Sequence, residues 1–136
     1  MDMQAISPAE SIRLLATVPV GRIVFTVRAL PAVRPVNFIV DGGSVVIRTG
    51  PGSKLTAAVR NAVVAFEADE IDVANHTGWS VTVTGRVQEV RDVAEQDRLR
   101  PLLQPWASGE KEHFLRIVPE LVSGVRLSPA SMLVPD

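Results

Sequence analysis

The segment that decides the fold reads Val45-Val46-Ile47-Arg48-Thr49-Gly50-Pro51-Gly52-Ser53-Lys54-Leu55. An apolar run typical of a buried strand ends at Arg48 and Thr49, and a Gly-Pro-Gly turn separates it from a helix start at Ser53 and Lys54. This order predicts that the four polar side chains surround one turn, beside the N–H groups of the first helical turn. Backbone donors, the helix dipole and two cations favour a phosphate monoester. We therefore predict that this bend binds the phosphate end of a cofactor.

Each of these side chains also has an ordinary structural explanation. Most Arg and Lys side chains are solvated surface charges, while Thr49 and Ser53 suit a strand end and a helix N-cap. The turn and the helix start favour the phosphate interpretation for Arg48 and Lys54. The two roles of Ser53 are compatible, because the hydroxyl of an N-cap borders the same anion site.

The composition limits both the fold and the classes of function. The chain has 136 residues, of which 46% are hydrophobic and 4% aromatic, and this predicts a single domain, residues 1–136, with a core of branched aliphatic residues on strands. Cysteine is absent and there are only two histidines, so we expect no disulfide, no thiolate catalysis and no metal site. The apolar content also suggests that a second subunit covers part of the surface.

Charge and terminal sequence indicate where the protein works. The net charge of −1 comes with scattered basic residues, which is not the footprint of a nucleic-acid-binding protein. No apolar run approaches the roughly 20 residues of a membrane helix, and the first residues lack the pattern of a signal peptide. We expect a cytoplasmic protein with a small-molecule substrate and no nucleic-acid or membrane partner.

Turn and cap residues predict a mainly β chain with a few short flanking helices. Ser7-Pro8-Ala9-Glu10 predicts a helix start with a capping box, and Asp41-Gly42-Gly43 predicts a hairpin. We expect six strands, at 21–27, 33–40, 44–49, 62–68, 79–90 and 114–127, and helices between Ser7 and Pro19, at 53–60 and at 94–103. We further expect an acidic turn at 69–72, a bulge or bend at Gly85 and an interruption at Pro119. Hairpin connections indicate an antiparallel sheet, which closes into a barrel to hide its edges.

Three motifs, taken together, carry a family resemblance. They are Arg34-Pro35-Val36-Asn37-Phe38, then Ile47 to Leu55, then Gly78-Trp79-Ser80-Val81-Thr82-Val83-Thr84-Gly85. In this order and at these intervals they resemble the pyridoxamine 5′-phosphate oxidase-like proteins, over about residues 7 to 127. The resemblance implies the six-stranded antiparallel split β-barrel of the flavin and deazaflavin oxidoreductases. The short chain is most similar to the nitroimidazole-resistance-like branch.

The resemblance also implies a cofactor, FMN, and the residues that contact it. These are Arg34, Pro35, Val36, Asn37, Arg48, Thr49, Ser53, Lys54, Leu55, Trp79 and Ser80. In such proteins the site lies at the interface of a homodimer, and each subunit contributes to both sites. From the residues alone, Trp79 is equally well explained as plain core, and His113 is a candidate for a contact across the dimer interface. No catalytic residue is identified.

The C-terminal region departs from the true pyridoxamine phosphate oxidases. Those proteins carry a signature rich in Arg and His, whereas residues 124–130 here hold only Arg126. The resemblance therefore implies an FMN-dependent oxidoreductase that transfers hydride to or from a small flat organic substrate, and not pyridoxine 5′-phosphate oxidation. Two alternatives stay open: an F420-dependent reductase on the same barrel, and a non-catalytic flavin- or haem-binding carrier or sensor.

Overall fold

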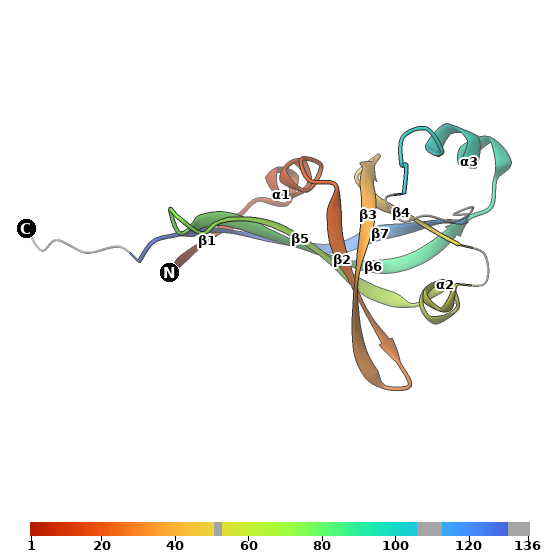
Figure 1. Cartoon of the computed structure of the whole chain (residues 1–136), viewed down its shortest axis with the longest axis horizontal. Helices are drawn as coiled ribbons and strands as arrows, with labels where there is room; N and C mark the ends of the chain where they lie inside the picture. Colours follow the sequence, from red (N-terminus) through yellow and green to blue (C-terminus); the bar gives the residue numbers. More distant parts are fainter. Residues whose placement is uncertain (51–52, 106–112, 131–136) are drawn as a thin grey trace, which may run out of the picture.

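Six antiparallel strands close into a ring of hydrogen bonds, and a seventh strand is added beside it (Figure 1). The computed structural model describes residues 1–50, 53–105 and 113–130. Within them, the strands are β1 (Asp2–Ile6), β2 (Val20–Val27), β3 (Leu30–Asp41), β4 (Ser44–Thr49), β5 (Val63–Asp72), β6 (Thr77–Val90) and β7 (His113–Ser128). The helices are α1 (Pro8–Leu15), α2 (Lys54–Val59) and α3 (Val93–Leu99). The ring runs β7-β4-β3-β2-β5-β6 and returns to β7, which confirms the predicted six-stranded barrel.

Strand β7 connects the different parts of the ring. It pairs with β6 over nearly its whole length, from Phe114 to Leu127. On its other side it pairs with β4 at residues 113–117 and with β1 at residues 124–128. The register of β6 against β7 shifts between Thr84 and Gly85, so the bulge predicted at Gly85 is confirmed.

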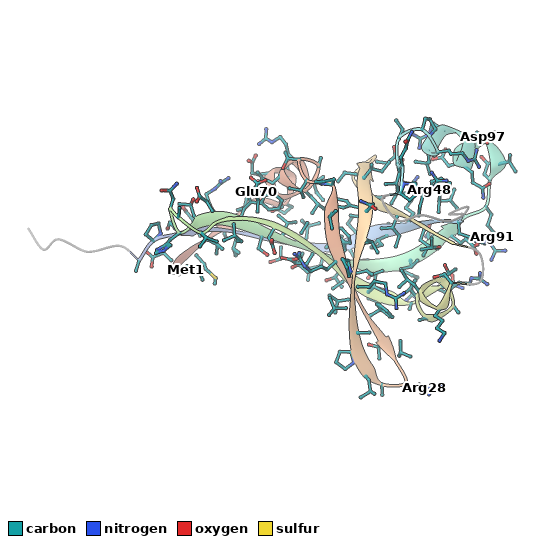
Figure 2. All side chains as sticks on the ribbon, in the orientation of Figure 1. Met1, Arg28, Arg48, Glu70, Arg91 and Asp97 are labelled. Carbon is teal, nitrogen blue, oxygen red and sulfur yellow. The ribbon has the colours of Figure 1, made fainter. Side chains whose placement is uncertain are left out.

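Two tight hairpins turn through left-handed backbone. The predicted β3–β4 turn is confirmed: Gly42 and Gly43 have φ values of +58° and +79°, as the two central positions of a type I′ turn require. The β2–β3 turn uses Arg28 and Ala29 with φ values of +52° and +65°. This second hairpin projects away from the ring, with Arg28 at its tip (Figure 2).

The core is divided by the sheet into a large and a small cluster. The large cluster fills the barrel and includes Ile23, Phe66 and Leu115, with Leu15 of α1 packed into it. The small cluster joins Val46 and Phe114 to Leu99 of α3 and to Leu103, and residues 93–105 are called the α3 segment below. Helix α3 is thereby fixed over β4 and β7, beside the region where the sequence predicts the ligand.

Several expected elements differ from the structure. The acidic residues 69–72 are not a turn but the end of β5, because each pairs with a residue of β6 between Thr77 and Ser80. Strand β7 continues through Pro119, which lies opposite Gly85 at the bulge, where a proline is tolerated. Strand β1 was not expected, and α3 is shorter than predicted. None of the helices in the described ranges has the length and hydropathy needed to span a membrane.

Candidate functional site

A cleft of about 220 Å³ opens where β3 and β4 separate. The two strands pair from Phe38–Ile47 to Asp41–Ser44, so residues 34–37 and 48–50 continue past the last paired residues and leave space between them. The start of α2 closes the far side. The lining residues are Arg34, Pro35, Val36, Asn37, Arg48, Thr49, Gly50, Ser53, Leu55 and Pro105. All the residues predicted to contact the cofactor line this cleft, except Lys54, Trp79 and Ser80.

The β3 side of the cleft behaves as a sheet edge. Residues 34–37 pair with β2 on one side only, with Pro35 opposite Arg22. Proline lacks an N–H and is found in sheets mainly at such edges, which explains Pro35 within a strand. The side chain of Arg34 is exposed, and those of Val36 and Asn37 are half-buried.

Arg48 forms the wall between the cleft and the α3 segment. Its Nη1 donates to the carbonyl oxygen of Leu103 at 2.9 Å and approaches that of Arg100 at 3.5 Å. Its guanidinium carbon lies 4.9 Å from the centre of the Phe114 ring, a cation–π contact. These contacts fix a half-buried cation at the edge of the cleft, and the predicted contact of Arg48 with phosphate remains a prediction.

The hydroxyl groups of the cleft already have local partners. Thr49 and Thr56 share a buried hydrogen bond, with 2.7 Å between their Oγ1 atoms. Ser53 caps α2, since its Oγ accepts from the Leu55 N–H at 3.1 Å. The sequence interpretation did not identify Thr56 as a residue beside the cleft. The available signal was its position next to the apolar residues of a short helix, which indicates a buried hydroxyl group. The interpretation also missed Pro105, which no local pattern connects to the cleft.

The predicted arrangement of four polar side chains around one turn holds for three of them. Arg48, Thr49 and Ser53 meet at the cleft, and the Ser53 N–H donates to the Gly50 carbonyl at 3.2 Å. Lys54 is exposed on α2 and does not line the cleft. Pro51 and Gly52 of the predicted turn lie outside the described residues.

Trp79 and Ser80 lie away from this cleft on β6. Trp79 is 6% exposed and belongs to the large core cluster. Ser80 Oγ donates to Glu67 at 3.1 Å, and Arg22 pairs with the same carboxylate at 2.8 Å. Burial, and then the adjacent Asp69 carboxyl, raise the pKa of Glu67. Within one chain, Trp79 packs in the core cluster, and the predicted contacts of Trp79 and Ser80 with the cofactor stay predictions.

The two histidines and the acidic residues do not form a metal centre in the described part of the chain. His113 Nδ1 lies 2.9 Å from Glu89 Oε1, and this hydrogen bond lowers the pKa of Glu89. The contact of His113 across a dimer interface stays a prediction. His76 lies in the exposed β5–β6 turn. No three His, Asp or Glu side chains converge among the residues that the structure describes.

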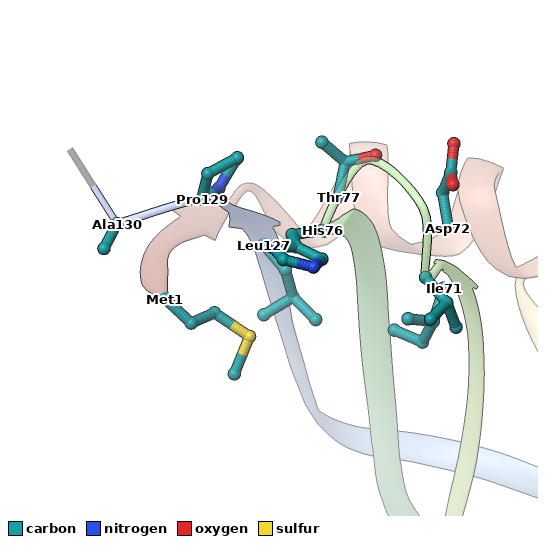
Figure 3. A pocket seen from close by; sticks show the side chains of 9 residues that line it. Met1, Ile71, Asp72, His76, Thr77, Leu127, Pro129 and Ala130 are labelled. Carbon is teal, nitrogen blue, oxygen red and sulfur yellow. The ribbon is translucent and has the colours of Figure 1, made fainter. Parts of the chain in front are cut away.

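A larger hollow of about 400 Å³ lies where the β5–β6 turn meets both ends of the described chain (Figure 3). Its lining is largely apolar, with Met1, Ile71 and Leu127 around it and the ring of His76 directed into it. No Arg or Lys side chain is among its lining residues. Its described lining therefore lacks the guanidinium groups that suit a phosphate, unlike the cleft beside Arg34 and Arg48.

Comparison with known proteins defines the family. The model of the pyridoxamine 5′-phosphate oxidase family matches residues 7–126. An uncharacterised protein of Mycobacterium tuberculosis is 46% identical over 123 residues, which are 87% of this chain and 81% of that protein. The FAD-binding protein from Mycobacterium smegmatis has a TM-score of 0.80 at 36% identity, covering 93% of this chain and 99% of its own. A FAD-binding protein from Mesorhizobium loti has a TM-score of 0.77 at 25% identity, covering 95% and 99%. From residue 7 to residue 126, therefore, this chain belongs to the pyridoxamine 5′-phosphate oxidase family.

Proposed function

We propose that this protein is a flavin-dependent oxidoreductase that binds the phosphate end of its flavin in the cleft between β3, β4 and α2. The observation that carries the proposal is the cleft itself, which brings together two sequence motifs on either side of the β3–β4 hairpin and has Arg34 and Arg48 in one lining. Two relatives are FAD-binding proteins by name. A bound flavin supplies the redox chemistry, by accepting or donating a hydride, and we propose a small flat organic molecule as its partner.

The residues of the cleft fit part of a flavin. Two guanidinium groups suit a phosphate, and the Asn37 amide and the Ser53 hydroxyl are suited to the hydroxyls of a ribityl chain. A volume of about 220 Å³ is below the range of roughly 300–1,000 Å³ for complete ligand sites. The ring system would therefore extend out of the cleft, past Val36, and requires a further surface to cover it.

We propose that a second copy of this chain supplies that surface. The β2–β3 hairpin, which leads into residues 34–37, exposes Val27, Leu30 and Val33 to 40%, 68% and 62%. A cluster of exposed apolar side chains beside a half-open ligand cleft is typical of a subunit interface. A homodimer would bury this hairpin and enclose the flavin ring between the two subunits, where water is excluded from the reacting atoms.

The first test is the visible spectrum of the purified protein. Flavin, F420 and haem have distinct absorption bands, so protein from a host that makes all three should show the flavin spectrum. A deazaflavin or Soret band instead would contradict the proposed cofactor.

A variant of Arg34 tests the position of the phosphate. Arg34→Ala should weaken flavin binding about 10- to 150-fold, since a hydrogen bond to a charged group contributes about 1.5–3 kcal/mol. Arg34→Lys should retain part of the affinity, and Arg13→Ala, an exposed cation on α1, should retain all of it. Fluorescence titration of the flavin-free protein measures all three. Equal affinities of Arg34→Ala and wild type would contradict the placement.

Turnover separates an enzyme from a carrier. The reduced flavin on the protein should transfer electrons to a nitroaromatic or a quinone faster than free reduced flavin does, because the protein orients both reactants. Stopped-flow oxidation of the reduced protein measures this rate. Rates no faster than free flavin over a panel of acceptors would favour the non-catalytic carrier.

A further inference from the structure

Two carboxyl groups on the outer face of the sheet share a single cation. Glu67 and Asp69 alternate with core residues along β5, so their side chains point outward. Arg22 Nη1 lies 2.8 Å from Glu67 Oε1 and 3.5 Å from Asp69 Oδ2, and Ser80 Oγ donates to Glu67 at 3.1 Å. Neither carboxylate pairs with a second Arg or Lys of the described residues. These four residues, called the acidic cluster below, are one positive charge short of neutral.

Partial burial makes the missing charge in the acidic cluster costly. The side chains of Glu67 and Asp69 are only 24% and 29% exposed. Burial, and then the neighbouring Asp69 carboxyl, raise the pKa of Glu67, which means that the charged form of Glu67 is disfavoured in the folded chain. A further cation beside the cluster would favour the charged form of both carboxyl groups.

A cation lies at the tip of the β2–β3 hairpin, away from the ring (Figure 2). This residue, Arg28, is exposed and forms no ion pair with any residue that the structure describes. Its φ of +52° lies in the left-handed region, which is unfavourable for a residue with a Cβ atom. Local backbone strain of this kind is typical of positions with a function, and here it holds a guanidinium outward.

Apolar side chains separate the acidic cluster from Arg28 on the same part of the sheet. Val24 lies opposite Val33 of β3 and opposite Ala65 of β5, so the three side chains share one face. Arg22 points to that face too, two residues before Val24. From Arg22 to Arg28 the chain advances about 20 Å, at roughly 3.4 Å per residue. Along the hairpin, therefore, a surface with excess negative charge is followed by an apolar surface and then by a cation.

We propose that two copies of this chain pack antiparallel across this face, so that Arg28 of each copy supplies the missing cation to the acidic cluster of the other. A two-fold axis near Val24 and Val33 would exchange the charged ends, as an interface between identical surfaces requires. The valines of both copies would then meet between two equivalent charge contacts. The inference rests on the homodimer of the proposed function, and it adds the contact that sets the orientation of the two copies.

Exchange of the two charges tests this contact on the full chain. Sedimentation equilibrium gives the Kd of the wild-type dimer. Arg28→Glu should raise this Kd at least about tenfold, because carboxylates then face each other, and Asp69→Arg should raise it as well. The double variant Arg28→Glu with Asp69→Arg restores opposite charges, so its Kd should return to within about threefold of wild type. Arg13→Glu, the same charge reversal on α1, should leave the Kd unchanged.

A glycine variant separates the contact from folding of the turn. Arg28→Gly removes the cation, and glycine adopts the left-handed conformation without strain. The variant should keep the circular dichroism spectrum of the wild type and still form a weaker dimer. Added salt should raise the Kd of the wild type more than that of Arg28→Gly, since salt screens the lost ion pair.

Two results would overturn the inference and leave the proposed homodimer standing. One is a dimer whose Kd changes with neither Arg28→Glu nor Arg28→Gly. The other is a double variant that remains as weak as its single variants. A wild type that stays monomeric at every concentration, with and without flavin, would remove both the homodimer and the contact.

Discussion

Thr49 and Thr56 form a buried hydroxyl pair beside the cleft, with 2.7 Å between their oxygens. Their side chains are only 5% and 6% exposed. Replacement of Thr56 by Val keeps the shape but leaves the Thr49 hydroxyl without its partner. Because an unsatisfied buried hydroxyl costs about 1–3 kcal/mol, Thr56→Val should lower the free energy of unfolding by that amount in urea titrations.

The double variant Thr49→Val with Thr56→Val is the matched control. It removes both hydroxyls and leaves neither unsatisfied, so it should be more stable than the single variant and near the wild type. A double variant less stable than Thr56→Val alone would show that the hydroxyls have another structural role.

Sequence motifs predicted most of the cleft because its lining comes from residues next to strand ends. Positions 34–37, 48–49, 53 and 55 follow from local order along the chain, and the pairing of β3 with β4 brings them together. Lys54 is adjacent in sequence but lies on the outer side of α2. The partner of Arg48 could not be predicted, because the Leu103 carbonyl comes from a segment that only tertiary packing brings near.

At the scale of elements, the bulge of β6 depends on a residue without a side chain. A Cβ atom on Gly85 would overlap the carbonyl oxygen of Val118 on β7. Gly85→Ala should therefore lower stability by about 1–3 kcal/mol, the usual cost of overpacking. Thr84→Ala, at the preceding position, needs no added space and should cost less. Thermal unfolding followed by circular dichroism compares the two, and equal melting temperatures would contradict this role of Gly85.

Helix α3 is attached to the ring by an ion-pair network around Asp41. The carboxylate accepts from Arg98 at 2.8 Å and from Arg116 at 3.1 Å, and Arg116 also pairs with Glu95 of α3 at 3.2 Å. The hydrogen bonds from Arg98 and then Arg116 outweigh burial and lower the pKa of Asp41 from 3.8 to about 2. The network joins the β3–β4 hairpin, β7 and α3.

This network predicts a stability that depends on pH. Because the pKa of Asp41 is lower in the folded than in the unfolded state, its contribution is complete above about pH 4 and is lost as the pH falls towards 2. Asp41→Asn should be less stable than wild type at pH 6, and the difference should shrink towards pH 2. Urea midpoints at several pH values measure it. A difference independent of pH would contradict the assignment, and added salt should reduce it, since Arg98 is 47% exposed.

Elements with a strong local sequence signal were predicted, whereas strand segments that depend on a distant partner strand, such as β1 and the end of β5, were not. The cap of α1, with the Glu10 N–H donating to Ser7 Oγ at 3.2 Å, and the glycine hairpin at 42–43 have local causes. The end of β5 has an acidic composition typical of turns, yet ten β5 residues pair with β6. Strand β1 forms by pairing with the edge of β7, and no local sequence pattern predicts this pairing.

At the scale of the whole molecule, the exposed β2–β3 hairpin predicts self-association. Val33→Glu places a charge on the surface proposed as the subunit interface, where burial of an unpaired charge is costly. Because Val33 is 62% exposed in the single chain, the variant should fold, run as a monomer in analytical ultracentrifugation and lose affinity for flavin.

Leu121→Glu is the matched control for the interface. Leu121 is 63% exposed on β7 and lies outside the proposed interface, so the variant should keep the oligomeric state of the wild type. A monomeric wild type, or a dimeric Val33→Glu variant, would contradict the proposed dimer.

The position of β7 in the ring has a consequence for folding during synthesis. This strand is translated after the other strands, yet it pairs with residues 2–6, 45–49 and 78–90. A nascent chain that ends before residue 113 leaves β4 and β6 with open edges, which are templates for aggregation. Contacts so distant in sequence make for slow folding, so the growing polypeptide should depend on holding chaperones until the final strand leaves the ribosome.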